Sequence, residues 1–322
     1  MKNFCVTKGV YPTMITPYKK DGSIDEDAVR ALVRFYFEAG CDGIFAVCQS
    51  SEIFYLSLAE RVRLAELVVE EARALAAGDK SRAPLMIVAS GHVSEDPVAQ
   101  SEELNAIAAT GVDALILISN RMDIANTSDE AWIAETEALI STLPADLPLG
   151  VYECPKPYKR LLSERMIKWC AGSGRFYFVK DTCCDAALIE KRLAWCRGTQ
   201  LEIFNANAQT LLETLRAGAA GYCGVMANFH PELYVKLYHG LDFSSQEAAL
   251  LQSYLCLAAT TESLTYPCCA KDYLTRFRGV TMKCVARSND VTSYTPYQRG
   301  CVAQLALLDA KIMESIGGKC YE

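Results

Sequence analysis

The segment FYFVKDTC, residues 176–183, is a short apolar run that ends in polar residues and precedes a helical pattern over residues 185–197. A run of this length without strict alternation is typical of a strand buried on both faces of a parallel sheet. The chain repeats this unit, with further apolar runs at residues 9–17, 42–49, 84–91, 114–120, 148–155, 201–207 and 221–228. Helical periodicity separates the runs, over residues 26–39, 58–77, 95–109, 128–143, 163–171, 185–197 and 209–217.

Eight strands separated by seven helices predict an α/β fold, the (β/α)8 TIM barrel. An open doubly wound sheet is the alternative, but such a sheet usually has a glycine-rich phosphate turn after its first strand. The sequence at that place is TPYKKDG, residues 16–22, which lacks this motif. The pattern therefore favours the barrel.

The length of 322 residues exceeds the roughly 250 residues of a typical barrel. Helical patterns over residues 246–262 and 299–316 account for the excess. We therefore expect a barrel carrying the active site over residues 1–240. A helical C-terminal extension over residues 241–322 then packs on the barrel or on a partner subunit.

Composition excludes several classes of function. The 32 Lys and Arg against 39 Asp and Glu give a net charge of −7, which argues against a nucleic-acid-binding protein. No apolar run approaches the roughly 18 residues of a membrane span. The start, MKNFCVTKG, has no apolar signal core, so we expect a cytoplasmic protein with reduced thiols.

Fifteen cysteines invite a metal or disulfide interpretation, but the pattern supports neither. There is no Cys-x-x-Cys, and the chain has only three histidines. We therefore expect no metal site, and most cysteines are interpreted as small core hydrophobes.

The active site of a (β/α)8 barrel lies at the carboxyl ends of its strands. Polar residues follow or end several predicted strands, which makes them the candidates for binding and catalysis. They are Gln49, Ser50, Ser51, Glu52, Ser119, Asn120, Arg121, Tyr152, Glu153, Lys180, Asp181, Asn205 and Asn207.

Lys180 is the most informative candidate, because its strand neighbours are aromatic and aliphatic. Burying an ammonium there is costly, which favours the neutral amine that attacks a ketone to form a Schiff base. The alternative is a lysine at a strand end that reaches solvent or pairs with Asp181 or Glu153. Tyr152 on the neighbouring strand is a proton-transfer candidate or an ordinary core tyrosine. Residues 49–52 either hold a carboxylate or form an ordinary polar loop.

Four motifs, in order along the predicted strands, resemble the dihydrodipicolinate synthase/N-acetylneuraminate lyase family of Schiff-base-forming class I aldolases. They are GVYPTMITP at residues 9–17, GVYECP at 150–155, VKDT at 179–182 and GVMAN at 224–228. The resemblance extends from Gly9 to about Pro231.

The resemblance implies a 2-oxo acid, usually pyruvate, bound as an imine on Lys180, with Tyr152 transferring protons. The iminium acts as the electron sink, so no metal or organic cofactor is needed. Ser50 and neighbouring amides are expected to bind the carboxylate. Family members are commonly homodimers or homotetramers, and the expected partners are small molecules: a 2-oxo acid and an aldehyde.

The sequence also departs from the family. Gln49 replaces the hydroxyl residue of the proton relay, and Arg121 stands nearest the place of its second tyrosine. Lys159 or Arg160 is the substitute for the arginine that receives the aldehyde's carboxylate in the synthase. Asn205-Ala206-Asn207 replaces a glycine-containing turn, and Val225 replaces the polar strand-8 residue of the sialic acid enzymes.

These departures favour a lyase or aldolase that joins or cleaves a 2-oxo acid and an aldehyde other than those two enzymes' substrates. A sugar-acid dehydratase and 4-hydroxy-tetrahydrodipicolinate synthase are enzymatic alternatives that use the same imine. A barrel that binds a small acid and regulates without turnover is the non-enzymatic alternative.

Overall fold

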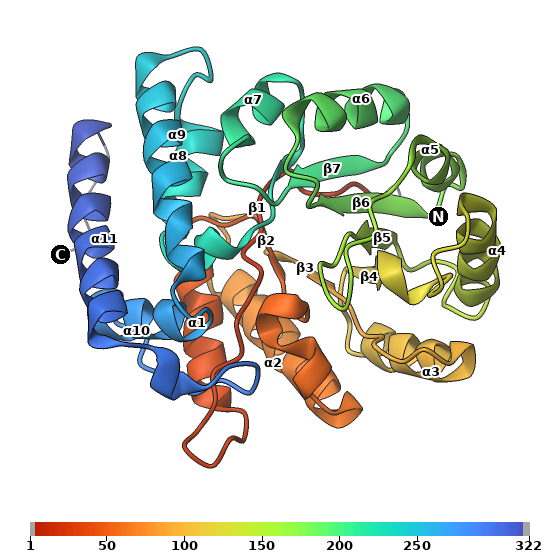
Figure 1. Cartoon of the computed structure of the whole chain (residues 1–322), viewed down its shortest axis with the longest axis horizontal. Helices are drawn as coiled ribbons and strands as arrows, with labels where there is room; N and C mark the ends of the chain where they lie inside the picture. Colours follow the sequence, from red (N-terminus) through yellow and green to blue (C-terminus); the bar gives the residue numbers. More distant parts are fainter. Residues whose placement is uncertain (1–3, 318–322) are drawn as a thin grey trace.

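The computed structural model describes residues 4–317 and contains one sheet of eight parallel strands. The strands are β1 (Gly9–Val10), β2 (Gly43–Phe45), β3 (Met86–Ala89), β4 (Ala114–Ile118), β5 (Leu149–Tyr152), β6 (Phe176–Asp181), β7 (Glu202–Asn205) and β8 (Gly221–Tyr222). Their order is β1-β8-β7-β6-β5-β4-β3-β2, and a parallel bridge between Thr13 and Phe45 joins the two ends. The predicted (β/α)8 barrel is confirmed (Figure 1).

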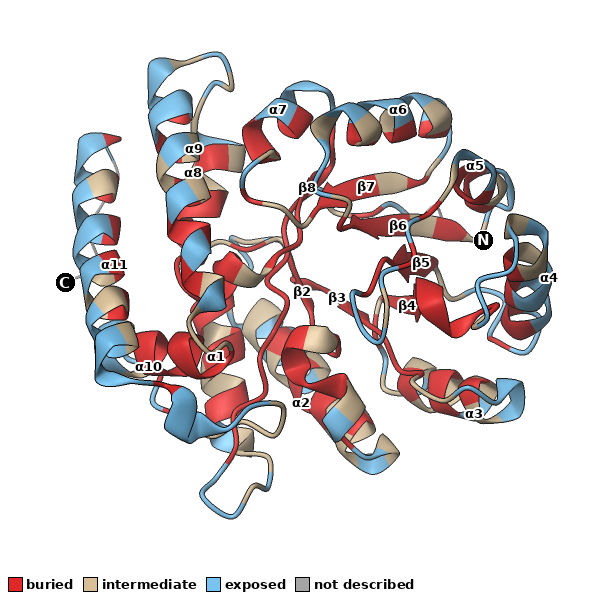
Figure 2. Cartoon of the chain, viewed as in Figure 1, coloured by how far each residue is buried: buried red, intermediate tan, exposed pale blue. Residues whose placement is uncertain are grey.

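Helices follow the strands and surround the barrel (Figure 1). They are α1 (Glu26–Glu38), α2 (Leu58–Gly78), α3 (Pro97–Ala108), α4 (Asp129–Ile140), α5 (Glu164–Gly172), α6 (Ala186–Cys196), α7 (Leu211–Arg216) and α8 (Pro231–Gly240). Side chains cap several of the helices. Ser128 and Ser163, for example, accept hydrogen bonds from first-turn N–H groups of α4 and α5. Buried residues line the inward side of these helices, and exposed residues cover the outer side (Figure 2).

The first and the last strand are shorter in the structure than the sequence predicts. The run at residues 9–17 contributes only two residues to β1, because Pro12 lacks the N–H that a sheet ladder needs. The run at residues 221–228 likewise leaves the sheet after Tyr222 and ends in the 3-10 turn η4 (Val225–Asn228).

Residues after Gly240 form the C-terminal helices α9 (Gln246–Ala258), α10 (Cys268–Phe277) and α11 (Pro296–Ser315). Asp309 on α11 is buried and accepts hydrogen bonds from Tyr254 on α9 and Tyr273 on α10, which ties the three helices together. No helix among residues 4–317 is long and apolar enough to cross a membrane.

The prediction for the C-terminal extension differs from the structure in two places. The predicted helix over residues 246–262 stops at Ala258, and the chain tightens into the 3-10 turn η5 (Ala259–Ser263). Helix α10 was not predicted.

Among residues 4–317 all fourteen cysteines are free thiols, and eight of them are buried. The fifteenth, Cys320, lies outside the described residues.

Candidate active site

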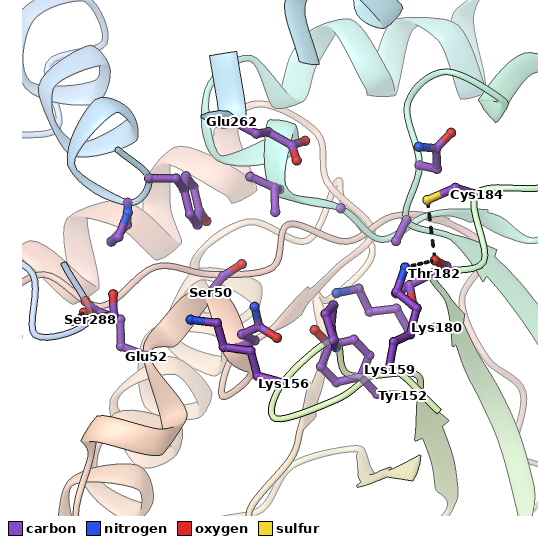
Figure 3. Close-up of a pocket in the computed structure, with 18 of the residues that line it drawn as sticks. Ser50, Glu52, Tyr152, Lys156, Lys159, Lys180, Thr182, Cys184, Glu262 and Ser288 are labelled. Carbon is purple, nitrogen blue, oxygen red and sulfur yellow. Dashed lines mark hydrogen bonds between the residues drawn. The ribbon is translucent and has the colours of Figure 1, made fainter. Parts of the chain in front are cut away.

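A cavity of ≈ 430 Å³ lies at the carboxyl ends of the barrel strands. Strand ends and βα loops supply one part of its lining, including Gln49, Ser50, Glu52, Tyr152, Lys156, Lys159, Lys180, Thr182, Cys184, Asn207 and Val225. The C-terminal extension supplies the rest: Glu262, Tyr266, Pro267, Ser288 and Asn289 (Figure 3). The site is thus built jointly by the barrel and the extension.

Lys180 and Tyr152 meet inside the barrel. They are register partners on β6 and β5, and the Lys180 Nζ lies 4.1 Å from the centroid of the Tyr152 ring and 5.7 Å from that of Phe45. Lys180 is only 4% exposed, and Tyr152 is 2% exposed. The amine therefore ends among aromatic faces at the floor of the cavity.

The two carboxylates that the sequence offers as partners of Lys180, Glu153 and Asp181, bind another group. Glu153 and Asp181 point away from the barrel interior, because successive side chains of a strand face opposite sides. Both pair with the fully buried guanidinium of Arg192 on α6, at 2.7 Å for Glu153 Oε1. Burial and the nearby Asp181 raise the pKa of Glu153. Among residues 4–317 no ion pair joins Lys180 to either carboxylate.

The residues after β2 form the short 3-10 turn η1 (Gln49–Ser51). The Ser50 Oγ lies 3.1 Å from the Thr13 Oγ1, and Ser50 lines the cavity. Ser51 is turned away, with its Oγ at 2.7 Å from the carbonyl of Met14 and 2.8 Å from that of Ala46. Of the two serines, Ser50 therefore faces the cavity.

The expected proton relay is replaced by different groups. Two residues after Tyr152, the Cys154 thiol donates to the Gln49 Oε1 at 3.3 Å. Burial raises the pKa of Cys154 to about 11 and that of Tyr152 well above its ordinary value. The thiol is thus bound to an amide, which does not take up a proton near neutral pH.

Glu52 lines the cavity but is also bound to the extension. It adopts a left-handed backbone (φ 62°), and its Oε2 accepts hydrogen bonds from the N–H groups of Arg287 and Ser288, both at 2.6 Å. Its Oε1 lies 3.7 Å from the buried Nζ of Lys271 on α10. Glu52 thereby fixes the segment that carries Ser288 and Asn289.

Besides Glu153 and Asp181, six candidates from the sequence do not line the cavity: Ser51, Ser119, Asn120, Arg121, Arg160 and Asn205. Arg160 pairs with Asp123 at 2.9 Å, and Arg121 donates to the carbonyl of Val93. The amide of Asn205 is bound by Thr210 and Thr214, whereas Asn207, two residues later, does line the cavity.

The sequence prediction missed the residues that the extension supplies. Glu262 lies in η5 and Tyr266 follows that turn, and no strand pattern points to either residue. The only sequence signal is that Glu262 ends the helical pattern over residues 246–262 and that Tyr266 follows four residues later. Burial raises the pKa of Glu262 to about 7.

Within residues 4–317 no cluster of three His, Cys, Asp or Glu side chains could hold a metal ion.

Comparison with known proteins identifies relatives of this chain. The profile of the Dihydrodipicolinate synthetase family matches residues 6–265. A 4-hydroxy-tetrahydrodipicolinate synthase of Methanothrix thermoacetophila is 25% identical over 230 residues, which cover 71% of this chain and 72% of the relative. An N-acetylneuraminate lyase of Mediterraneibacter gnavus is 25% identical over 257 residues, covering 80% and 77%.

A solved structure shares the fold over nearly the whole chain. It is a prophage protein of the dihydrodipicolinic acid synthase family from E. coli K12, in complex with pyruvate. The two chains superpose with a TM-score of 0.80 at 19% identity, covering 97% of this chain and 99% of the other.

Proposed function

The chain belongs to the Dihydrodipicolinate synthetase family, whose members include synthases and lyases, and we propose from that premise that it joins or cleaves pyruvate and an aldehyde through an imine on Lys180. It is an enzyme of the lyase and aldolase type. One observation carries the proposal: the Lys180 amine ends against the ring of Tyr152 at the floor of the cavity, with the neighbouring carboxylates committed to Arg192.

The proposed chemistry begins at the ketone carbon of the 2-oxo acid. The amine of Lys180 attacks this carbon, and loss of water leaves an iminium. The iminium accepts the electron pair of the adjacent carbon as an enamine, which forms a carbon–carbon bond with an aldehyde or is released when that bond breaks. Tyr152 lies against the amine, where its hydroxyl can pass protons during imine formation.

We propose that Ser50 binds the carboxylate of the 2-oxo acid. Its hydroxyl faces the cavity, and the N–H groups of Gln49 and Ser50 open η1, where backbone N–H groups have no partner within the helix. Oriented N–H groups and a hydroxyl are suitable donors to a carboxylate. The pyruvate complex of the E. coli structure supports pyruvate as the 2-oxo acid.

The remaining volume is proposed to hold an aldehyde with an anionic group. Lys156 and Lys159 line the cavity from the loop after β5, and the Lys159 Nζ donates to the carbonyl of Thr182 at 2.8 Å. Asn207 faces the same space and offers an amide for a hydroxyl or carbonyl. Lys159 is therefore preferred over Arg160, whose guanidinium is held by Asp123.

Borohydride reduction tests the proposed imine. Incubation with pyruvate and borohydride is expected to add the mass of the reduced adduct to the peptide that contains Lys180. The variant Lys180→Arg keeps the positive charge but forms no such adduct. Condensation of pyruvate is then measured with glyoxylate, succinate semialdehyde and glyceraldehyde. No adduct with pyruvate or any other 2-oxo acid would contradict the proposal.

We further propose a homodimer or homotetramer that works in the cytoplasm without a metal or organic cofactor. Residues 1–240 form the barrel in this proposal and residues 241–322 the extension. Light scattering of the purified protein tests the assembly, and a monomer at micromolar concentration would contradict it.

A further inference from the structure

The proposed carbon–carbon step requires a group that accepts a proton and passes it on, and the strand ends of this chain lack the expected relay behind Tyr152. When the bond breaks, the hydroxyl on the departing carbon must lose its proton. Gln49, in the place of the relay's hydroxyl residue, offers an amide that accepts from Cys154, and Arg121 lies outside the cavity. A carboxylate that faces the aldehyde fragment would supply such a proton acceptor.

The C-terminal extension provides such a group in Glu262. Because helix α9 stops at Ala258, η5 turns Glu262 into the cavity. Figure 3 shows its carboxylate reaching in from the side opposite to Tyr152 and Lys180. Within residues 4–317 no hydrogen bond or ion pair occupies its oxygens.

The surroundings of Glu262 suit proton transfer near neutral pH. Burial raises its pKa to about 7, against the opposing effect of Lys180, so both protonation states are accessible there. A general acid–base is most efficient when its pKa lies near the working pH. Glu52 is not equivalent, because its carboxylate is committed to two backbone N–H groups.

We propose that Glu262 is the catalytic acid–base for the aldehyde fragment, an assignment that rests on the proposed function. In cleavage, its carboxylate takes the proton of the hydroxyl next to the breaking bond. The oxygen electron pair forms the carbonyl of the aldehyde, and the carbon–carbon pair moves into the enamine on Lys180. In condensation, protonated Glu262 returns this proton to the aldehyde oxygen as the new bond forms.

The placement of Glu262 separates the two halves of the reaction. Lys180 and Tyr152 face each other from β6 and β5, where the 2-oxo acid is activated. Glu262 faces them across the cavity, so the space between them is open to a second fragment when the first is attached to Lys180. Formation of the enamine and reaction with the aldehyde thus depend on different groups.

The variant Glu262→Gln tests this division, because glutamine keeps the shape but cannot exchange the proton. Three measurements are made on the full chain: borohydride trapping with pyruvate, deuterium exchange of the pyruvate methyl group in D2O, and condensation with the best aldehyde of the panel. Trapping and exchange are expected to stay within a few-fold of wild type. The kcat of condensation is expected to fall about 10²-fold or more.

The pH profile gives a second readout that a purely structural role would not produce. Condensation needs protonated Glu262, so the wild-type rate is expected to fall as the pH rises through about 7. Glu262→Gln should lack this descent, and Glu262→Asp should retain it with a reduced kcat. Glu247→Gln, an exposed carboxylate of the same extension, serves as the matched control and should change nothing.

Unchanged condensation and an unchanged profile in Glu262→Gln would overturn the inference. An equal loss of methyl exchange and condensation would overturn it as well, because Glu262 would then act on the imine half. A wild-type enzyme that forms no adduct, or condenses no aldehyde, contradicts instead the proposed function on which the inference rests.

Discussion

Tyr152 and Lys180 occupy paired positions on neighbouring parallel strands, with the Lys180 Nζ 4.1 Å from the centroid of the Tyr152 ring. Since alternate residues of a strand face opposite sides, the same register sends Glu153 and Asp181 outward to Arg192. Tyr152 and Lys180 therefore lie in the cavity, whereas the next residue of each strand, Glu153 or Asp181, stabilises the barrel wall.

Tyr152→Phe removes the hydroxyl at the amine while the ring keeps its contact with Phe45, at 5.5 Å between centroids. We expect turnover to fall about 10²- to 10⁴-fold, the usual range for a lost proton-transfer group. The pyruvate adduct should still form, more slowly, in a borohydride time course. Tyr177→Phe, near the start of β6 and packed against Phe4, is the control, and equal rates in both variants would contradict a role for the Tyr152 hydroxyl.

Ser50→Ala removes the proposed donor to the pyruvate carboxylate. A hydrogen bond to a charged group contributes about 1.5–3 kcal/mol, so the KM for pyruvate should rise about 10- to 100-fold with a smaller change in kcat. Ser51→Ala is a matched control, because its hydroxyl contacts the carbonyls of Met14 and Ala46. That variant should lose stability and leave the KM unchanged; the reverse pattern would reassign the carboxylate site.

Arg192→Met leaves the carboxylates of Glu153 and Asp181 buried without their counter-ion. Breaking a buried ion pair from one side costs about 3–5 kcal/mol in the free energy of unfolding, which urea denaturation measures. Arg165→Met breaks an exposed pair with Glu130 and should cost about 0–1 kcal/mol. Equal losses in the two variants would show that the buried network does not stabilise the barrel wall.

The sequence predicts the barrel and its floor because both depend on local patterns. Apolar runs of strand length, separated by helical periods, define the eight strands, and polar residues at their carboxyl ends must meet at one face. Lys180, Tyr152 and Ser50 follow from this rule. The same rule also selects Arg121, Arg160 and Asn205. They lie outside the cavity, because each is bound by a partner elsewhere in the fold.

The far wall of the cavity depends on contacts that no local pattern contains. Glu52 and Arg287 are 235 residues apart in the sequence and joined by a hydrogen bond of 2.6 Å. Glu262 enters the cavity only because α9 ends at Ala258, within a stretch whose periodicity continues to residue 262. Such residues become predictable only when the packing of the extension on the barrel is known.

The last prediction concerns the ion pair that attaches the segment around Arg287, part of the far wall of the cavity, to α2. Arg287 donates to both carboxylate oxygens of Glu60, at 2.6 and 3.0 Å, and its backbone N–H donates to Glu52. The hydrogen bond from Arg287 lowers the pKa of Glu60 from 4.5 to about 2. Because the folded-state pKa is depressed, this stabilisation is fully present above about pH 4.5 and is lost as the pH falls towards 2.

Glu60→Gln isolates the ion pair, since glutamine still serves the capping box in which Glu60 accepts the Ser57 N–H at 2.9 Å. The variant should be less stable than wild type at pH 6, and this difference should shrink as the pH falls from 5 to 3. Urea unfolding at these pH values measures it, with Glu66→Gln on the same helix as the control. A constant difference at every pH would mean that Glu60 stabilises the wall through packing rather than through its charge on Arg287.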